Sequence, residues 1–134
     1  MSAGLLRTDA VIVACAVSAG IHAALAPEHF RETTGAGIGF VAATVALGVL
    51  AVVLTLRPSE PAFAAAAVVF AGLIGSYVLA VTTGIPVIHP DVDHVEGLAL
   101  GTKAIEAGAL VLAVAAWRPL QAPLSLTQPK GTLT

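Results

Sequence analysis

Residues 35–56 read GAGIGFVAATVALGVLAVVLTL, an apolar run without a single charged side chain. At a rise of about 1.5 Å per residue, a helix of this length crosses the roughly 30 Å hydrocarbon core of a bilayer. The run stops at Arg57-Pro58, where a charge and a helix-breaking residue follow one another. The segment is therefore predicted to be a transmembrane helix.

Three further apolar stretches flank this segment, at about residues 9–26, 62–83 and 93–117. Each is long enough to span a bilayer as a helix. The first is expected to end at Pro27, because the residue before a proline is pushed out of helical geometry. The fourth is expected to begin near Asp93. Together with residues 35–56, these stretches predict four membrane spans.

The composition agrees with a membrane protein. The chain is 57% hydrophobic and 10% charged, with a mean hydropathy of +0.96, far more apolar than a soluble domain of this size. We predict an all-α fold in which residues 1–120 form an antiparallel bundle of four transmembrane helices. Residues 121–134 contain prolines and polar residues and are predicted to be a flexible cytoplasmic tail. Ala24-Leu25-Ala26 resembles a signal-peptide cleavage site, but the proline directly after it obstructs cleavage, so the first stretch is expected to be retained.

Basic residues indicate the orientation. With four spans, both termini and the connection between the second and third spans lie on one side of the membrane. That side carries Arg7, Arg57, Arg118 and Lys130, whereas the two other connections carry only Arg31. The positive-inside rule then places both termini in the cytoplasm. The protein is predicted to lie in the plasma membrane. The connections after the first and third spans are expected to face outward.

The four histidines all lie near those two outward connections, and we call this end of the protein the histidine rim. Imidazole binds copper and zinc well, and carboxylates can complete a mixed ligand shell. The sequence therefore predicts a transition-metal site, for copper or zinc, although the spacing matches no stringent metal-binding motif. The candidate ligands are His22, His29, His89, His94, Asp91 and Glu96.

Several of these residues also have a simpler structural interpretation. Asp93 and Glu96 have the spacing of a helix capping box at the start of the fourth span. Glu32 is expected to lie in a solvated connection with local ion pairs. His22 differs, because an imidazole inside a membrane span is rare and faces protein or a water-filled cavity. It is interpreted as a metal ligand, a proton carrier or a packed polar residue.

Lys103 and Glu106 form a second polar feature, inside the fourth span. Charges at that depth are costly unless they are paired or hydrated. Their i,i+3 spacing makes them neighbours on a helix, so mutual pairing is the simplest interpretation. Together with Glu96 they also describe a polar track from the rim toward the middle of the membrane, as proton or solute transport requires.

Other chemistries find little support. Cys15 is the only cysteine, which excludes an intrachain disulfide and a thiolate zinc cage. The chain has no glycine-rich phosphate loop and no nucleophile elbow, so it is not expected to be an enzyme on its own. Haem held between His22 and His94 is disfavoured because aromatic residues make up only 4% of the chain. No basic cluster indicates nucleic acid.

Three functions therefore stay open. The first is metal handling at the histidine rim. The second is a non-catalytic accessory subunit of a larger membrane complex, such as a respiratory assembly. The third is proton or small-solute transport through Lys103 and Glu106. The expected partners are the lipid bilayer and, through stripes of small residues on the helices, further copies of the chain or other membrane subunits.

Overall fold

The computed structural model describes residues 3–120, and this part of the chain is all-helical. Its helices are each long and apolar enough to cross a membrane, which confirms four candidate spans and the all-α class. The predicted flexible tail, residues 121–134, lies outside the described residues. The helices are α1 (Ala3–Glu32), α2 (Thr34–Leu56), α3 (Glu60–Thr82) and α4 (Gly97–Leu120).

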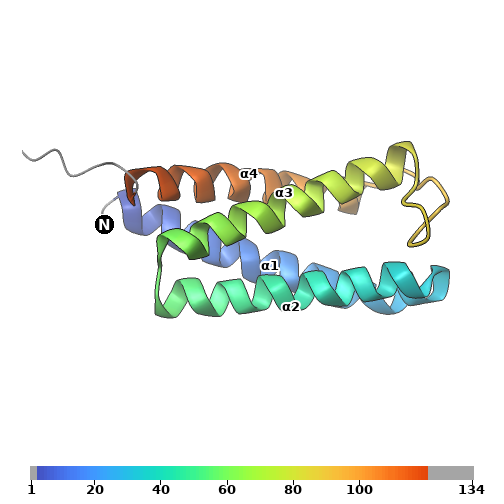
Figure 1. Ribbon diagram of the computed structural model, residues 1–134, viewed down its shortest axis with the longest axis horizontal. Coiled ribbons are helices and arrows are strands. Elements are labelled where there is room, and N and C mark those ends of the chain that lie inside the picture. The colour runs from blue at the N-terminus through green and yellow to red at the C-terminus, as the bar shows by residue number, and fades with distance from the viewer. Residues whose placement is uncertain (1–2, 121–134) are drawn as a thin grey trace, which may run out of the picture.

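The connections between the helices lie at opposite ends of an elongated molecule. The α1–α2 and α3–α4 connections are at one end of Figure 1, and the α2–α3 connection is at the other. α1 packs most extensively on α2, and α4 packs on both α3 and α1. The contact between α2 and α3 is the smallest of the four. The α1–α4 interface thus joins the first helix of the chain to the last.

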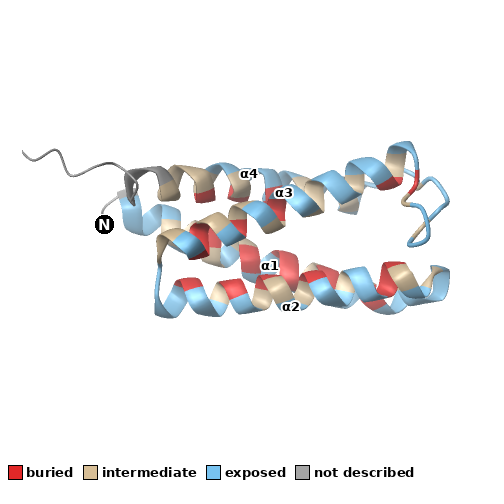
Figure 2. Ribbon diagram, viewed as in Figure 1, coloured by how far each residue is buried: buried red, intermediate tan, exposed pale blue. Residues whose placement is uncertain are grey.

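The apolar core occupies the half of the molecule that lies toward the α2–α3 connection (Figure 2). It is built from side chains of all the helices and includes Cys15, which is completely buried as a small apolar residue. The outward faces are also apolar, as lipid contact requires, with Val45, Val68 and Val111 among the exposed side chains. The largest core residues are Leu47, Leu50, Leu54, Phe63 and Phe70.

The predicted end of the first helix at Pro27 is wrong. α1 begins at Ala3 and continues through Pro27 to Glu32. The proline removes one backbone donor, but packing of the following turn holds the helical path, because the Phe30 ring lies over Gly37 of α2. Any side chain at Gly37 would displace this ring. His22 and His29 consequently belong to the same helix.

The expected capping box at the start of the fourth helix is also absent. α4 begins at Gly97, and the Asp93 backbone N–H donates to the Ala80 carbonyl at the end of α3, with an N···O distance of 3.0 Å. This bond holds the chain at Asp93 against the end of α3, and the helical conformation of α4 therefore begins only at Gly97. Instead the Glu96 carbonyl accepts the first helical hydrogen bond, from the Leu100 N–H at 3.0 Å.

The α3–α4 connection contains a tight turn in a left-handed conformation. Ile85 and His89 exchange two backbone hydrogen bonds, at 2.6 and 2.8 Å, and Pro86 and Val87 lie between them. Val87 has φ +68°, and Gly84 just before the turn has φ +70°. Proline followed by a residue with positive φ is the pattern of a type II turn, in which glycine normally takes the place of Val87.

Val87→Gly is expected to stabilise the protein by about 0.5–1 kcal/mol. A left-handed conformation destabilises a β-branched residue by about 1–2 kcal/mol, and glycine removes this strain. Part of the gain is lost because glycine increases the conformational entropy of the unfolded chain. Val87 is 98% exposed, so its removal costs no packing. Thermal unfolding in detergent measures the change, with Val92→Gly as a control at an exposed position without a positive φ. An equal loss of stability in both variants would contradict the assignment of strain to Val87.

Candidate functional site

Four polar side chains meet at the α1–α4 interface, and we call them the polar cluster: Ser18, His22, Lys103 and Glu106. Ser18 and His22 come from α1, one turn apart, and Lys103 and Glu106 come from α4, also one turn apart. Glu106 and Ser18 are completely buried, and His22 is 6% exposed. The cluster therefore lies inside the protein rather than at its surface.

Glu106 is the centre of this cluster. Its Oε1 accepts a hydrogen bond from the Ser18 hydroxyl at 2.8 Å, and its Oε2 accepts one from the Lys103 ammonium at 2.6 Å. The Nε2 atom of His22 lies 3.9 Å from Oε1. Lys103 and Glu106 are thus paired, as their i,i+3 spacing predicts, and the pair is shared with α1. A buried carboxylate with two donors and a close imidazole can hold either a charge or a proton.

His22 is fixed on the other side by its own helix. Its Nδ1 atom lies 2.8 Å from the Ser18 carbonyl oxygen, and its ring lies against Phe40 of α2 with centroids 5.2 Å apart. His29, two turns further toward the rim, also contacts Phe40, with centroids 3.8 Å apart. The Phe40 ring therefore lies between the buried imidazole and the one nearer the rim.

Lys103 has a second neighbour on α3. Its Nζ lies 5.7 Å from the centre of the Tyr77 ring, within the range of a cation–π contact. The Tyr77 hydroxyl is buried and has no hydrogen-bond partner among the described residues. The Lys103 side chain is 17% exposed, so this side of the polar cluster is the one closest to solvent.

At the histidine rim, two histidines pair with acids that are close in sequence. The Nδ1–H of His29 donates to Glu32 at 2.7 Å, and the Nε2–H of His89 donates to Asp93 at 2.7 Å. The Thr33 hydroxyl, directly after the first pair, donates to the Ile88 carbonyl at 2.6 Å and joins the end of α1 to the connection that carries the second pair. The remaining candidate ligands of the rim are exposed and form no such pair: Asp91, His94 and Glu96.

The rim as described does not gather the six ligands that the sequence suggested. Within residues 3–120, no three His, Cys, Asp or Glu side chains lie together in the arrangement of a metal site. His22 lies apart from the rim pairs in the polar cluster, and Asp93, interpreted as a helix cap, is instead the partner of His89. The metal prediction therefore rests on the two histidine–carboxylate pairs.

The hydrogen bond to Asp93 raises the pKa of His89 above the ordinary histidine value. Burial lowers this pKa by less than the hydrogen bond raises it, and the charges of Asp93, Glu32 and Asp91 add to the rise. Because the pKa of His89 is higher in the folded protein, this pair stabilises the fold fully below about pH 6.5, the ordinary value, and loses its contribution as the pH rises through the raised pKa.

Asp93→Asn is expected to lower the pKa of His89 back toward the ordinary histidine value, because it removes the carboxylate that holds the imidazolium. NMR titration of the His89 ring measures this change. Asp91→Asn is the matched control, since Asp91 acts on His89 only through its charge, and its effect on the pKa should be clearly smaller. Equal shifts in the two variants would contradict the role of the hydrogen bond.

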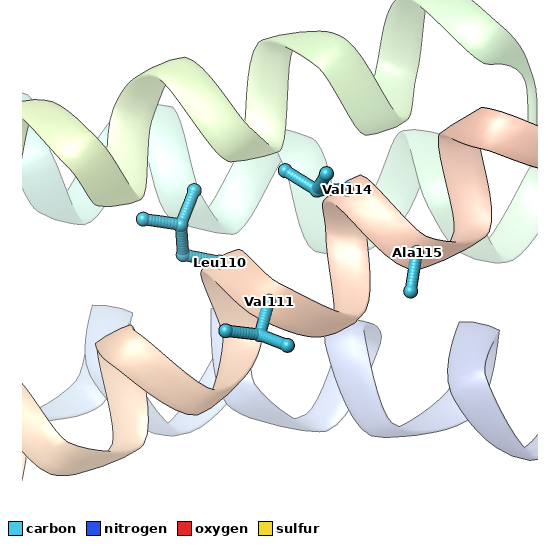
Figure 3. A pocket seen from close by; sticks show the side chains of 4 residues that line it. All are labelled: Leu110, Val111, Val114 and Ala115. Carbon is cyan, nitrogen blue, oxygen red and sulfur yellow. The ribbon is translucent and has the colours of Figure 1, made fainter.

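Two depressions on the described part of the protein are mainly apolar, and none of the four side chains of the polar cluster lines them. One depression of about 300 Å³ is lined by α4 side chains alone, none with a polar group (Figure 3). Another of about 520 Å³ lies between α1 and α4 and includes one polar side chain, Asp9. Both are open to the outside of the protein. The depression in Figure 3 is formed by Leu110, Val111, Val114 and Ala115.

Ser18 and Phe40 were not predicted from the sequence to belong to the candidate site. Ser18 precedes His22 by four residues, so a helical α1 places both on one face, and this spacing was the available signal. The contact of Phe40 with His22 and His29 depends on how α2 packs against α1 and has no such signal. Comparisons of the chain with protein families, with curated proteins and with solved structures find no match.

Proposed function

We propose that the chain is a proton-transporting membrane protein in which Glu106 takes up and releases the transported proton. The observation that carries this proposal is a carboxylate with no exposed surface, in a helix long enough to span a membrane, that contacts another helix through Ser18 and His22. Ionisable side chains inside a membrane are expensive and mark proton or ion pathways by default. A purely apolar contact between α1 and α4 would avoid the free energy that is needed to bury these ionisable groups.

The proposal includes the orientation of the protein. The helices span the plasma membrane as an antiparallel bundle with both termini in the cytoplasm, and the histidine rim faces outward. Four basic residues on the side of the termini support this orientation, against Arg31 alone at the rim. The connections lie at opposite ends in Figure 1, which supports the antiparallel arrangement of the helices.

The two halves of the bundle differ in polarity, which favours a carrier over an open channel. From the polar cluster toward the rim, the chain offers His29 and further titratable groups. In the opposite direction the described core is closed by apolar side chains such as Leu54, Phe63 and Phe70. A proton bound at Glu106 therefore exchanges with the rim side first, and its passage to the other side requires a rearrangement of the helices.

Proton uptake by proteoliposomes tests this function. A potassium gradient with valinomycin sets an inside-negative potential, and an internal pH-sensitive dye reports proton uptake. Uptake is expected for the native chain and should fall to the level of protein-free vesicles for Glu106→Gln, which keeps the shape of the side chain but holds no exchangeable acid proton. Asp9→Asn is the control outside the polar cluster. No uptake by the native chain, or equal uptake by Glu106→Gln, would overturn the proposal.

Metal binding at the histidine rim is a second candidate, supported by the rim pairs. Glu32 accepts a hydrogen bond from one ring nitrogen of His29, and Asp93 accepts one from a ring nitrogen of His89. In each neutral imidazole the other ring nitrogen then has a lone pair that can bind a metal. Carboxylates orient metal-binding histidines in this way. The remaining nitrogen of His89, Nδ1, is buried and has no hydrogen-bond partner among the residues described.

Calorimetric titration with Zn²⁺, and with Cu²⁺ separately, tests the second candidate. Binding is expected to weaken at least tenfold in His89→Ala, because a ligand is removed, and to stay unchanged in His94→Ala, whose exposed side chain has no orienting carboxylate. Absence of binding to the native chain, or equal weakening in both variants, would rule out this site.

Assembly with further membrane helices is the remaining part of the proposal. Several glycines on α3 and α4 have open space where a Cβ would project, so that another helix can approach the backbone closely. This supports a homo-oligomer or a place as an accessory subunit in a larger membrane complex. Examples are Gly72, Gly75 and Gly101.

A further inference from the structure

We propose that His22 passes the proton to Glu106 from the rim side, and that the Ser18 carbonyl fixes the imidazole tautomer that makes this transfer possible. The inference rests on the proposed function, since it assigns the route by which Glu106 is loaded. It concerns two residues of α1 and one of α4, all of them buried.

The tautomer of His22 follows from its hydrogen bond. The Ser18 carbonyl oxygen is only an acceptor, so the Nδ1 atom 2.8 Å away must carry a hydrogen. The Ser18 hydroxyl, 3.4 Å from the same Nδ1, already donates its hydrogen to Glu106 and does not compete for this role. In neutral His22 the second nitrogen, Nε2, is therefore bare and carries a lone pair.

That lone pair faces Glu106. The distance from Nε2 to Oε1 is 3.9 Å, and a lone pair opposite a carboxylate oxygen repels it unless a proton lies between the two atoms. Oε1 accepts one hydrogen bond, from Ser18, and has a second lone pair for such a proton. The gap is longer than the roughly 2.6–3.2 Å needed for direct transfer, so a small side-chain rotation or one water molecule must close it.

The transfer conserves atoms and charge. Imidazolium His22 carries hydrogens on both nitrogens, and its Nε2–H bond breaks while the electron pair stays on Nε2. A new O–H bond forms at Oε1, so that Glu106 becomes a neutral carboxylic acid and His22 becomes the neutral Nδ1–H tautomer. Lys103 then loses its anionic partner and keeps the nearby Tyr77 ring as a second contact.

The charged groups around His22 define the direction of loading. From α4, the Glu106 carboxylate attracts a protonated imidazole and the Lys103 ammonium opposes it; from α1, a protonated His29 also opposes it. α2 contributes the neutral Phe40 ring, which contacts both imidazoles. On the far side of the polar cluster, the only titratable side chain in the described core is Cys15. We therefore place the source of the proton on the rim side of His22, where His29 lies beyond the Phe40 ring.

The tautomer is tested directly by solid-state NMR of ¹⁵N-histidine-labelled protein in lipid bilayers. The His22 signals are identified by their absence from His22→Gln. Neutral His22 is expected with hydrogen on Nδ1, and the same tautomer should persist in Ser18→Ala, which removes the hydroxyl but retains the carbonyl. A neutral His22 with hydrogen on Nε2 would overturn the inference, and this measurement on the native chain does not depend on whether a variant folds.

The route is tested by proton uptake into the vesicles described above. His22→Gln is expected to slow uptake about 100-fold, the lower range for loss of a positioned proton-transfer group. His94→Gln, at the exposed rim, should leave uptake unchanged. If Glu106→Gln abolishes uptake but His22→Gln leaves it intact, the inference fails and the proposed function stands. If uptake does not depend on Glu106, both fail.

Discussion

Glu106→Leu is expected to lower the free energy of unfolding by about 3–5 kcal/mol, the range for breaking a buried ion pair from one side. The substitution leaves the Lys103 ammonium, whose side chain is 17% exposed, without its carboxylate partner. Ser18 also loses its acceptor across the interface, although a serine in a helix can turn its hydroxyl to a carbonyl of its own helix. The penalty is therefore dominated by the stranded charge.

The double variant Lys103→Leu/Glu106→Leu is the matched control. Replacing a whole buried pair with apolar residues is often neutral or stabilising, so most of the lost stability should return. Equilibrium unfolding in mixed detergent micelles, followed by circular dichroism, measures both variants. If the double variant is as unstable as Glu106→Leu, the loss of stability comes from packing around residue 106 and not from the unpaired charge of Lys103.

Gly84→Ala is expected to destabilise the protein by about 2–4 kcal/mol. The residue has φ +70°, which costs an alanine roughly 1–2 kcal/mol. A Cβ at this position would also overlap the Pro90 carbonyl oxygen, and a backbone atom cannot move aside as a side chain can. Relief requires the turn that carries His89 to shift, so the substitution should also disturb the His89–Asp93 pair.

Gly108→Ala is the control for this substitution. Gly108 lies within α4 and has open space at the Cβ position, so alanine should stabilise the helix by up to about 1 kcal/mol. Thermal unfolding compares the two variants, and the NMR signal of the His89 ring reports the turn. Equal effects of the two substitutions on stability would show that the left-handed conformation at residue 84 does not constrain the connection.

The helical content could be predicted from the sequence because each span is a long apolar run between charges and prolines. The start of α2 and the end of α3 agree with the prediction to within one residue. The end of α1 and the start of α4 could not be predicted, because they depend on contacts between segments. Phe30 packs over Gly37 and holds α1 helical past its proline, and Asp93 is bound to the end of α3.

The candidate site was only partly accessible from the sequence for the same reason. The pairing of Lys103 with Glu106 follows from spacing on one helix. The contacts of Glu106 with Ser18 and His22 depend on how α1 packs against α4. Ser18 and Glu106 are 88 positions apart in the sequence, so spacing along one helix does not predict their contact. The order of the spans placed the rim histidines at one end, but it did not predict their partners, which are the acids three residues after His29 and four residues after His89.

The polar cluster and the histidine rim lie in the same half of the protein, the half that contains the α1–α2 and α3–α4 connections. α1 carries His22 and His29 on the side that faces Phe40, and its residue Ser18 contacts Glu106. The opposite half contains the apolar core and no described polar side chain of comparable burial. We therefore expect changes in the polar cluster to affect function as well as stability, and changes in the apolar core to affect stability.

Infrared difference spectroscopy of the protein in lipid bilayers tests the central claim most directly, because it detects the protonated form of a buried carboxyl group. The account predicts a carboxylic-acid C=O band that grows as the pH is lowered, shifts when H₂O is replaced by D₂O, and is missing from Glu106→Gln. Asp9→Asn, at an exposed carboxylate, should leave the band unchanged. Spectra in which Glu106→Gln removes no pH-dependent carboxyl band would contradict the account, because Glu106 would then be a permanently charged partner of Lys103.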